Sequence, residues 1–521
     1  MLASMGRARG HRGTPLTLRE LVAASVSASS QARGLGIVLG LLPVLAGCIL
    51  TADKLDPALD VAKTYRAAAG APGKAVPAPD WWRSFRSSEL TDLMEQSRAA
   101  NLSIAAAVAQ IVEADAQARI AGAALLPTVS GSASATRSRG STAGAGGGAG
   151  GGVGVGGGGG SDVTIFNSSL TASYVLDFWG HNRALTRAAE ETAVASRFNR
   201  EVVELTQLVS VANTYFLVLE GQDRLRVARE NTAAAERILK LIDDRFKSGT
   251  AAALDVAQQA SLVAIERATI PPLVVQVDQN RAILGLLVGR SPEHVTVRGG
   301  SNYKIAIPQI APGLPSELLT QRPDIRQAEA KLAGADANVD AARTAFFPTI
   351  QLTAQRGVQS AALATLFGPG AAFYSVAGGL TQPIFDGGML LGELDLQRGT
   401  REELLQDYRL AVISAFTDVE KALVAVAQFT RQEALQRDAV LQSRLAFKLS
   451  EDKLRGGVLD LPTLLQVEQT LFTQEDNLAQ VRFSRLQAVV SLYQALGGGW
   501  QLDRQLEQEA KLSPRREVTD P

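Results

Sequence analysis

The chain has 521 residues, with 52 basic and 52 acidic side chains and a formal net charge of zero. That balance gives no support to nucleic acid binding. The single cysteine excludes an internal disulfide. The three histidines, His11, His181 and His294, each stand alone in the sequence, so no metal cluster is evident.

Residues 1–47 have the features of a secretory signal peptide. Five arginines and one glutamate accompany the apolar run Leu35–Leu45, and two small residues follow it. The next residue, Cys48, completes the sequence Leu-Ala-Gly-Cys, which resembles a bacterial lipobox. In a lipobox the cysteine is acylated and becomes the mature N-terminus. We therefore expect a lipid on Cys48; the alternative is a buried or chance cysteine.

Residues 48–80 are rich in alanine and proline, which predicts an extended tether from the lipid anchor. The tether leads to Trp81-Trp82, which we expect to pack it onto the body rather than to bind a ligand. Beyond Leu45, no stretch of about 18 uninterrupted apolar residues occurs, so no transmembrane helix is predicted. A chain that crosses a membrane would then have to use strands.

Residues 81–290 begin with helical patterns and continue with two predicted strands, at about 128–139 and 163–178. The second strand alternates apolar and polar residues over about ten positions, with aromatic residues near both ends. That pattern is typical of a transmembrane barrel strand, although a half-buried strand of a soluble sheet would look the same. The lipobox and the missing transmembrane helix favour the barrel.

A glycine tract, Gly144–Gly160, separates these two strands. Matches to the dinucleotide-binding pattern G-x-G-x-x-G are nearly automatic in such a low-complexity segment. A nucleotide loop also needs a helix after it, and here a strand follows. We therefore expect a flexible hairpin loop.

Two proline-free stretches, 183–248 and 389–455, have apolar residues spaced by three and four, and each predicts one very long helix. At about 1.5 Å per residue, the second would be about 100 Å long. Each is followed by a glycine turn and a return helix, at 251–288 and 461–496. In the first return helix, Pro271-Pro272 predicts a kink or a break.

Residues 316–500 repeat the order of residues 81–290: helices, two strands at about 348–357 and 372–384, the long helix and the return helix. A repeat of about 200 residues is too long for a solenoid unit and indicates a duplicated domain.

The segment 291–315 is expected to connect the two repeats, with short β-like pieces at 295–297 and 304–307. The sequence Arg322-Pro-Asp324 suits the first turn of a helix better than a catalytic Arg–Asp pair. Residues 501–521 are a charged tail that we expect to be loose.

Four strands per chain cannot close a barrel with a lumen, which needs about eight or more. Open strand edges are not tolerated in a bilayer, so several chains must pool their strands. Three chains would supply twelve. The architecture therefore predicts a mixed membrane α+β fold, in which a trimeric 12-stranded transmembrane β-barrel continues into a long α-helical barrel.

Three motifs and the paired helix endings resemble the outer membrane factor family, of which TolC and OprM are typical. The motifs are Leu-Leu-Thr-Gln-Arg-Pro-Asp-Ile-Arg at 318–326, Phe-Pro-Thr at 347–349 and Gln-Pro-Ile-Phe-Asp-Gly-Gly at 382–388. The lipobox is similar to that of the NodT-type lipoprotein branch. The resemblance covers roughly residues 81–500. It implies a homotrimer in the bacterial outer membrane that extends into the periplasm.

The resemblance also implies partners and sites. The partners are a periplasmic adaptor (membrane fusion protein), an inner-membrane transporter of the RND type and outer membrane lipid. The adaptor would contact the two helix turns, at Ser248, Gly249, Thr250, Gly456, Gly457 and Val458. The periplasmic aperture would involve Asp255, Leu454, Thr463 and Gln466. Only Asp255 keeps a carboxylate there, and Leu454 stands where the family has a tyrosine.

The function implied is a passive exit duct of a tripartite efflux system for small toxic compounds. One alternative is the duct of a type I protein secretion system. Another is a structural coiled-coil envelope lipoprotein, which would not explain strand pairs placed alike in both repeats. No nucleophile–base set, metal cluster or cofactor loop is evident, so we expect neither an enzyme nor a cofactor other than the lipid on Cys48.

Overall fold

The computed structural model describes residues 65–66, 77–139, 162–298, 300–310 and 315–500. All of them belong to one compact unit, Pro57–Pro521. The expected signal peptide, Cys48, the glycine tract, the tail and nearly all of the expected tether lie outside the described residues.

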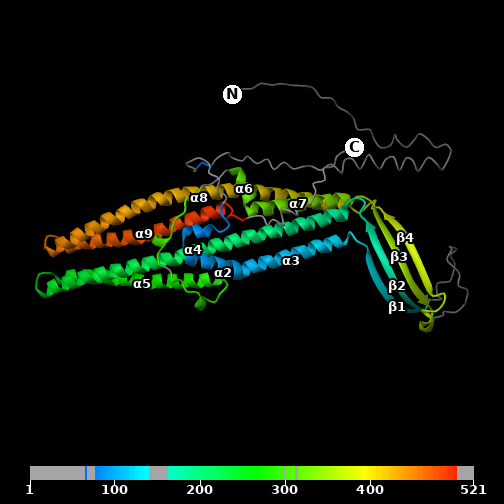
Figure 1. The fold of residues 1–521 in the computed structure, drawn as a ribbon, viewed down its shortest axis with the longest axis horizontal. Coiled ribbons are helices and arrows are strands. Elements are labelled where there is room, and N and C mark those ends of the chain that lie inside the picture. Colours follow the sequence, from blue (N-terminus) through cyan, green and yellow to red (C-terminus); the bar gives the residue numbers. More distant parts are fainter. Residues whose placement is uncertain (1–64, 67–76, 140–161, 299, 311–314, 501–521) are drawn as a thin grey trace, which may run out of the picture. The chain divides into compact units, whose positions relative to one another are not determined.

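Helices and strands follow one another in the same order in both parts of the chain (Figure 1). The first part contains η1 (Trp81–Phe85), α2 (Ser88–Ala100), α3 (Leu102–Ala123), β1 (Thr128–Arg139), β2 (Asp162–Leu176), α4 (His181–Lys247) and α5 (Ala253–Leu287). The turns η3 (Pro292–His294) and η4 (Asn302–Lys304) come next. The second part contains α6 (Pro315–Gln321), α7 (Pro323–Thr344), β3 (Thr349–Ser360), η5 (Leu363–Thr365), β4 (Ala372–Thr381), α8 (Met389–Arg455) and α9 (Leu461–Ala495).

Corresponding helices of the two parts have equal lengths. The long helices α4 and α8 have 67 residues each, the return helices α5 and α9 have 35 each, and α3 and α7 have 22 each. At about 1.5 Å per residue, each long helix spans about 100 Å. The buried face predicted from the apolar spacing of α4 is confirmed, since Ala212, Phe216 and Leu219 are all buried.

The long helices form two antiparallel hairpins, α4 with α5 and α8 with α9 (Figure 1). Helices α3 and α7 pack along α4, and α7 also contacts α8. The largest apolar cluster surrounds η1, where Trp81 and Trp82 are 2% and 1% exposed and Trp81 stacks on Tyr493 of α9. Both tryptophans are therefore packing residues, as the sequence predicted.

One expectation about irregular segments was wrong, and of the kink or break expected in the first return helix the break does not occur. Residues 295–297 and 304–307 form no strand, because no neighbouring strand pairs with them; instead, Ala306 donates to the carbonyl of Phe85, and Arg482 donates to the carbonyl of Ile305. Helix α5 continues through Pro271 and Pro272 without a break. Both prolines are exposed, so the carbonyl groups that lose a helical donor lie on the solvent side.

The four strands form one antiparallel sheet in the order β1-β2-β3-β4. The boundaries of β1 agree with the prediction, whereas β4 ends at Thr381, three residues earlier than expected. Pro383 explains this end, since it has no N–H for a ladder hydrogen bond. The sheet lies at one end of α4 and α8, and the two glycine turns lie at the other (Figure 1).

Candidate functional site

The sheet has one apolar face and one polar face. Paired residues of antiparallel strands share a face, and successive residues alternate between faces. One row of paired residues across all four strands is apolar and consists of Val129, Ala172, Ala354 and Val376. The adjacent row is polar and consists of Ser130, Thr171, Gln355 and Ser375. The alternation predicted for the second strand therefore extends over the whole sheet.

Polar side chains satisfy one another on the polar face. The amide of Gln355 donates to the hydroxyl of Ser169 at 3.0 Å, and Ser169 also bonds Ser132 at 3.2 Å. Gln351 donates to Ser173 in the same way, at 3.1 Å. Such a face is suited to water, whereas the opposite face is mostly apolar and has Arg356, Tyr174 and Tyr374 among its few polar residues.

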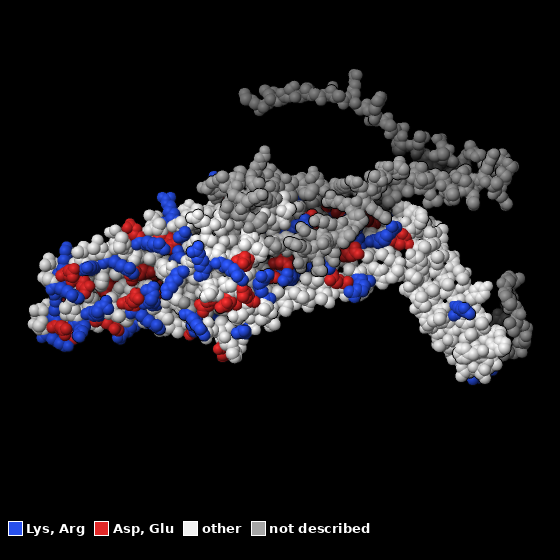
Figure 2. Space-filling view, viewed as in Figure 1, with Lys and Arg blue, Asp and Glu red and all other residues white. Residues whose placement is uncertain are grey.

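Both edges of the sheet are unpaired within the described chain, since β1 and β4 each have one neighbour. The strands are also nearly uncharged. They contain only Arg137, Arg139, Asp162 and Arg356 as charged residues, whereas charged side chains cover the visible surface of the helices (Figure 2). A sheet of this kind fits a bilayer only when other strands pair with its edges.

Aromatic and large apolar side chains gather where the sheet meets the helices. Trp179 stacks on Phe347, with ring centroids 4.7 Å apart, and its ring nitrogen donates to the carbonyl of Pro348. Phe178, Ile384 and Phe385 are 71%, 96% and 92% exposed. Such a belt is typical of the boundary between apolar membrane and water.

The two helix turns at the other end share one geometry. Gly249 and Gly457 have φ values of 78° and 72°, in the left-handed region that glycine adopts readily. The amide of Thr250 donates to the carbonyl of Arg245, and that of Val458 donates to the carbonyl of Lys453. Both turns are therefore Schellman motifs. All six predicted adaptor-contact residues are exposed, and Val458 is 80% exposed although it is apolar.

A cross-link between the two turns was not predicted. Arg245, in the last turn of α4, donates to the main-chain carbonyls of Leu454 and Arg455 at 2.7 and 2.9 Å. A basic residue near the end of a helix was the available signal, but its partner lies 209 residues away in sequence. Arg245 therefore holds the end of α8 against the end of α4.

The four predicted aperture residues lie near these turns in different environments. Asp255 caps the start of α5 by accepting the amide of Ala252 at 3.0 Å. Thr463 and Gln466 are exposed on the first turns of α9. Leu454 is buried in an apolar cluster with Ile242 of α4 and Leu464 of α9. Where the family has a tyrosine, apolar packing thus joins the two hairpins.

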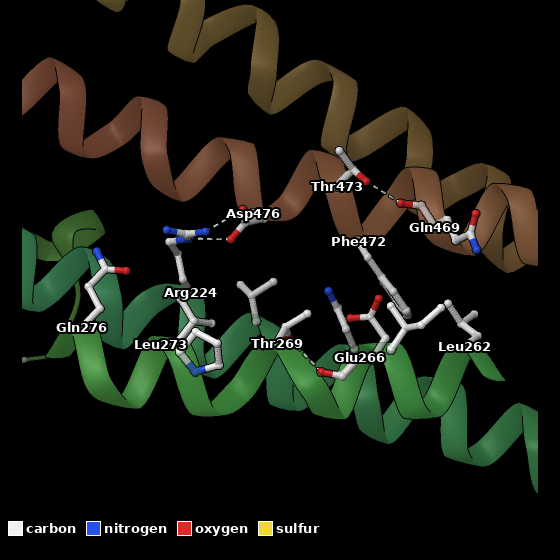
Figure 3. A pocket seen from close by; sticks show the side chains of 15 residues that line it. Arg224, Leu262, Glu266, Thr269, Leu273, Gln276, Gln469, Phe472, Thr473 and Asp476 are labelled. Carbon is white, nitrogen blue, oxygen red and sulfur yellow. Dashed lines mark hydrogen bonds and ion pairs between the residues drawn. The ribbon is translucent and has the colours of Figure 1, made fainter. Parts of the chain in front are cut away.

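Buried polar groups connect the hairpins farther along. In a groove of about 630 Å³ between α4, α5 and α9, Arg224 donates to both carboxylate oxygens of Asp476, at 2.7 and 3.1 Å (Figure 3). Nearer the turns, Gln259 of α5 donates to Glu468 of α9 at 3.4 Å, and both side chains are fully buried. Burial raises the pKa of Glu468 to about 7.

By length and composition alone, α4 and α5 each contain an 18-residue stretch apolar enough to cross a membrane. No such helix was predicted from the sequence. Half of the stretch in α4 is buried inside the protein, as in the core helix of a folded domain. Within the described ranges, no group of three or more histidine, cysteine, aspartate or glutamate side chains is placed to hold a metal ion.

Comparisons with known proteins agree with this architecture. The family model for outer membrane efflux proteins matches residues 93–290 and 314–498. The pyoverdine export outer membrane protein OpmQ of Pseudomonas aeruginosa is 38% identical over 463 residues, which are 89% of this chain and 96% of that protein. The toluene efflux pump outer membrane protein TtgF of Pseudomonas putida is 34% identical over 336 residues, covering 64% of this chain and 70% of that protein.

The fold is also similar to a solved channel structure. The open state of the outer membrane channel MtrE of Neisseria gonorrhoeae aligns with a TM-score of 0.75 and 28% identity, covering 86% of this chain and 98% of that one. With both halves matched by the family model and a relative 38% identical over most of its length, this chain belongs to the outer membrane efflux protein family.

Proposed function

We propose that this protein is the outer membrane exit duct of a tripartite efflux system and works as a homotrimer. The observation that carries the proposal is the four-stranded sheet with an apolar face, a polar face and two unpaired edges. Three copies would pool twelve strands and pair every edge. The barrel would turn its apolar face toward lipid and its polar face toward a water-filled lumen.

The four long helices of each copy would continue this barrel into the periplasm. Their ends at the glycine turns would form the periplasmic mouth, with Asp255, Thr463 and Gln466 around it and Leu454 closing the two hairpins on each other. We also propose that the two halves arose by duplication. Their equal helix lengths and the two matches of one family model support this.

Small compounds are the proposed cargo, and a passive pore needs no catalytic group. One relative is named for pyoverdine export and another for toluene efflux, which favours efflux over type I protein secretion. A structural coiled-coil lipoprotein would have no use for a sheet with one apolar and one polar face. Transport would then depend on an adaptor and on an inner-membrane transporter, which we propose to be of the RND type.

The adaptor is proposed to dock on the two turns. In each turn, nothing lies within 4 Å of the position where a side chain on Gly249 or Gly457 would begin. A large side chain at either glycine would therefore obstruct a docked partner without clashing with its own chain. The exposed apolar side chain of Val458 adds a contact surface for that partner.

Substitutions at Gly457 test this docking site. Gly457→Ala and Gly457→Phe both place a side chain on a residue with positive φ, and each should cost about 1 kcal/mol of stability. Only phenylalanine adds bulk, so alanine is the matched control for backbone strain. We expect Gly457→Phe to abolish crosslinking to the adaptor and drug resistance in a strain lacking its own duct. Gly457→Ala should retain both activities.

Full resistance with phenylalanine at both Gly249 and Gly457 would rule out docking at the turns. Equal loss with alanine and phenylalanine would instead mean that the turn conformation, and not access to it, is what transport requires. The amount of folded protein in the outer membrane is measured alongside, so that reduced assembly is not counted as lost docking.

The proposed lipid on Cys48 rests on the sequence, since this residue lies outside the described ranges. Cys48→Ser should abolish labelling by a fatty-acid analogue and block normal processing of the precursor. Barrel insertion should persist, because an acyl chain supplies only part of the membrane affinity. Undiminished labelling of the serine variant would contradict lipidation at this position.

A further inference from the structure

Arg356 is a charged residue on the apolar face of the sheet. It lies opposite Leu170 of β2 and Tyr374 of β4. The other charged strand residues, Arg137, Arg139 and Asp162, form ion pairs with one another at the end of the sheet away from the helices. Within the described ranges, the guanidinium group of Arg356 has no ion-pair or hydrogen-bond partner. An arginine on an apolar surface that faces lipid would be stabilised by an anionic partner.

A groove of about 620 Å³ on the sheet has Arg356 among its lining residues. The lining also includes the small residues Ala172 and Ala354 and the larger apolar residues Leu170 and Val376. Leu170 and Val376 are 62% and 79% exposed. A mostly apolar groove that contains an arginine matches a molecule with a hydrocarbon chain and an anionic group.

The position of Arg356 along β3 indicates where it lies in the membrane. It comes nine residues after Phe347, which belongs to the aromatic belt at the helical end of the sheet. Strand β3 begins at Thr349, and seven residues of strand rise about 23 Å, or about 18 Å across a membrane when the strand tilts by about 40°. The apolar band of such barrels is about 25 Å tall. The long arginine side chain can extend from there toward the far boundary of the band, where lipid phosphates of the outer leaflet lie.

We propose that Arg356 binds the phosphate of an outer-leaflet glycolipid of the lipid A type, with one acyl chain in the adjoining groove. This inference rests on the proposed function, because it needs the apolar face turned toward lipid. Guanidinium and phosphate match in charge and can form two parallel hydrogen bonds.

Lipid titration of the purified full-length protein tests the site. Phosphorylated lipid A, the same lipid without phosphates and phosphatidylglycerol are added in nonionic detergent, and bound lipid is counted by native mass spectrometry. We expect Arg356→Gln to weaken binding of phosphorylated lipid A by about tenfold or more, to the level of the dephosphorylated lipid. Arg356→Lys keeps the charge but loses the two parallel hydrogen bonds, so its affinity should lie between those of the wild-type protein and Arg356→Gln.

Arg137→Gln is the matched control, because this arginine already pairs with Asp162 at 2.7 Å. It should change the affinity by less than about twofold. Equal binding by the wild-type protein and Arg356→Gln would overturn the proposal. So would equal binding of phosphatidylglycerol and lipid A by the wild-type protein. Single-channel current of Arg356→Gln, expected to be unchanged, separates this result from a failure of the duct itself.

Discussion

Glu433→Ala is expected to lower the free energy of unfolding by about 3 to 5 kcal/mol, because it leaves buried arginines without their counter-charge. The side chains of Glu433 on α8 and Arg482 on α9 are 1% and 7% exposed. Glu433 accepts hydrogen bonds from Arg482, from Arg485 and from Arg437. Without the carboxylate, the guanidinium group of Arg482 would remain buried without its counter-charge, and the more exposed Arg485 and Arg437 would lose theirs.

The loss would reach beyond this pair of helices. Arg482 also donates to the main-chain carbonyls of Asn302 and Ile305, at 3.0 and 2.6 Å. The side-chain amide of Asn302 in turn donates to the carbonyl of Phe216. The main-chain N–H of Asn302 donates to the carboxylate of Asp223 on α4. The network therefore fastens the segment between the two halves of the chain to both helix hairpins.

Chemical unfolding of the purified protein, followed by circular dichroism, measures the effect. Glu230→Ala is the control, since its carboxylate is 60% exposed and pairs with the exposed Arg226; we expect a change within about 0.5 kcal/mol. Burial alone would raise the pKa of Glu433, but Arg485, Arg482 and Arg437 outweigh it and hold the pKa below its ordinary value. The stabilisation is therefore present at neutral pH and lost in acid. Equal changes in the free energy of unfolding for Glu433→Ala and Glu230→Ala would contradict the stabilising role of Glu433.

The second large effect is expected at Glu468, where Glu468→Gln should stabilise the protein by about 3 kcal/mol at pH 8. Burial raises the pKa of this carboxyl to about 7, against the weaker effect of the hydrogen bond from Gln259. Glu266 of α5 and Glu451 of α8 also raise it, and Arg237 of α4 lowers it. One oxygen of Glu468 and the oxygen of Gln259 have no hydrogen-bond partner in the described chain.

The sign of the pH dependence follows from the raised pKa. Stability is greatest below the ordinary pKa of glutamate, near 4.5, and declines as the pH rises through about 7, because the folded protein must then bury a charge. Thermal unfolding between pH 4.5 and 8 measures this decline. Glu468→Gln should remove it, whereas Glu403→Gln, at an exposed position on α8, should leave it unchanged. A decline that persists in Glu468→Gln would place its origin elsewhere.

Much of the fold could be predicted because its elements have strong periodic patterns. The apolar spacing in α4 and α8 and the alternation in β2 indicated both the type and the length of these elements. Pro271-Pro272 left a break in α5 open, and none occurs, because local propensity says nothing of the packing of α5 on α4. The β-like residues 304–307 misled the prediction, since a strand requires a partner that the sequence does not reveal.

The site was predictable only where its signal was local. Glycine after a long helix indicated the turns at Gly249 and Gly457, and the family resemblance supplied the aperture positions, which stay predictions. Arg245 and Glu433 depend on contacts between residues far apart in sequence, which no local pattern encodes. Arg356 was hidden for another reason: one arginine within a strand acquires meaning only when the register places it among apolar neighbours.

Single-channel recording in planar bilayers tests the central claim most directly. The purified full-length protein is reconstituted, and its insertion is checked by resistance to carbonate extraction. A trimeric duct with a water-filled lumen predicts discrete, uniform current steps that carry small ions without a nucleotide or a partner protein. Protein that is folded and inserted but carries no current at any voltage would contradict the account.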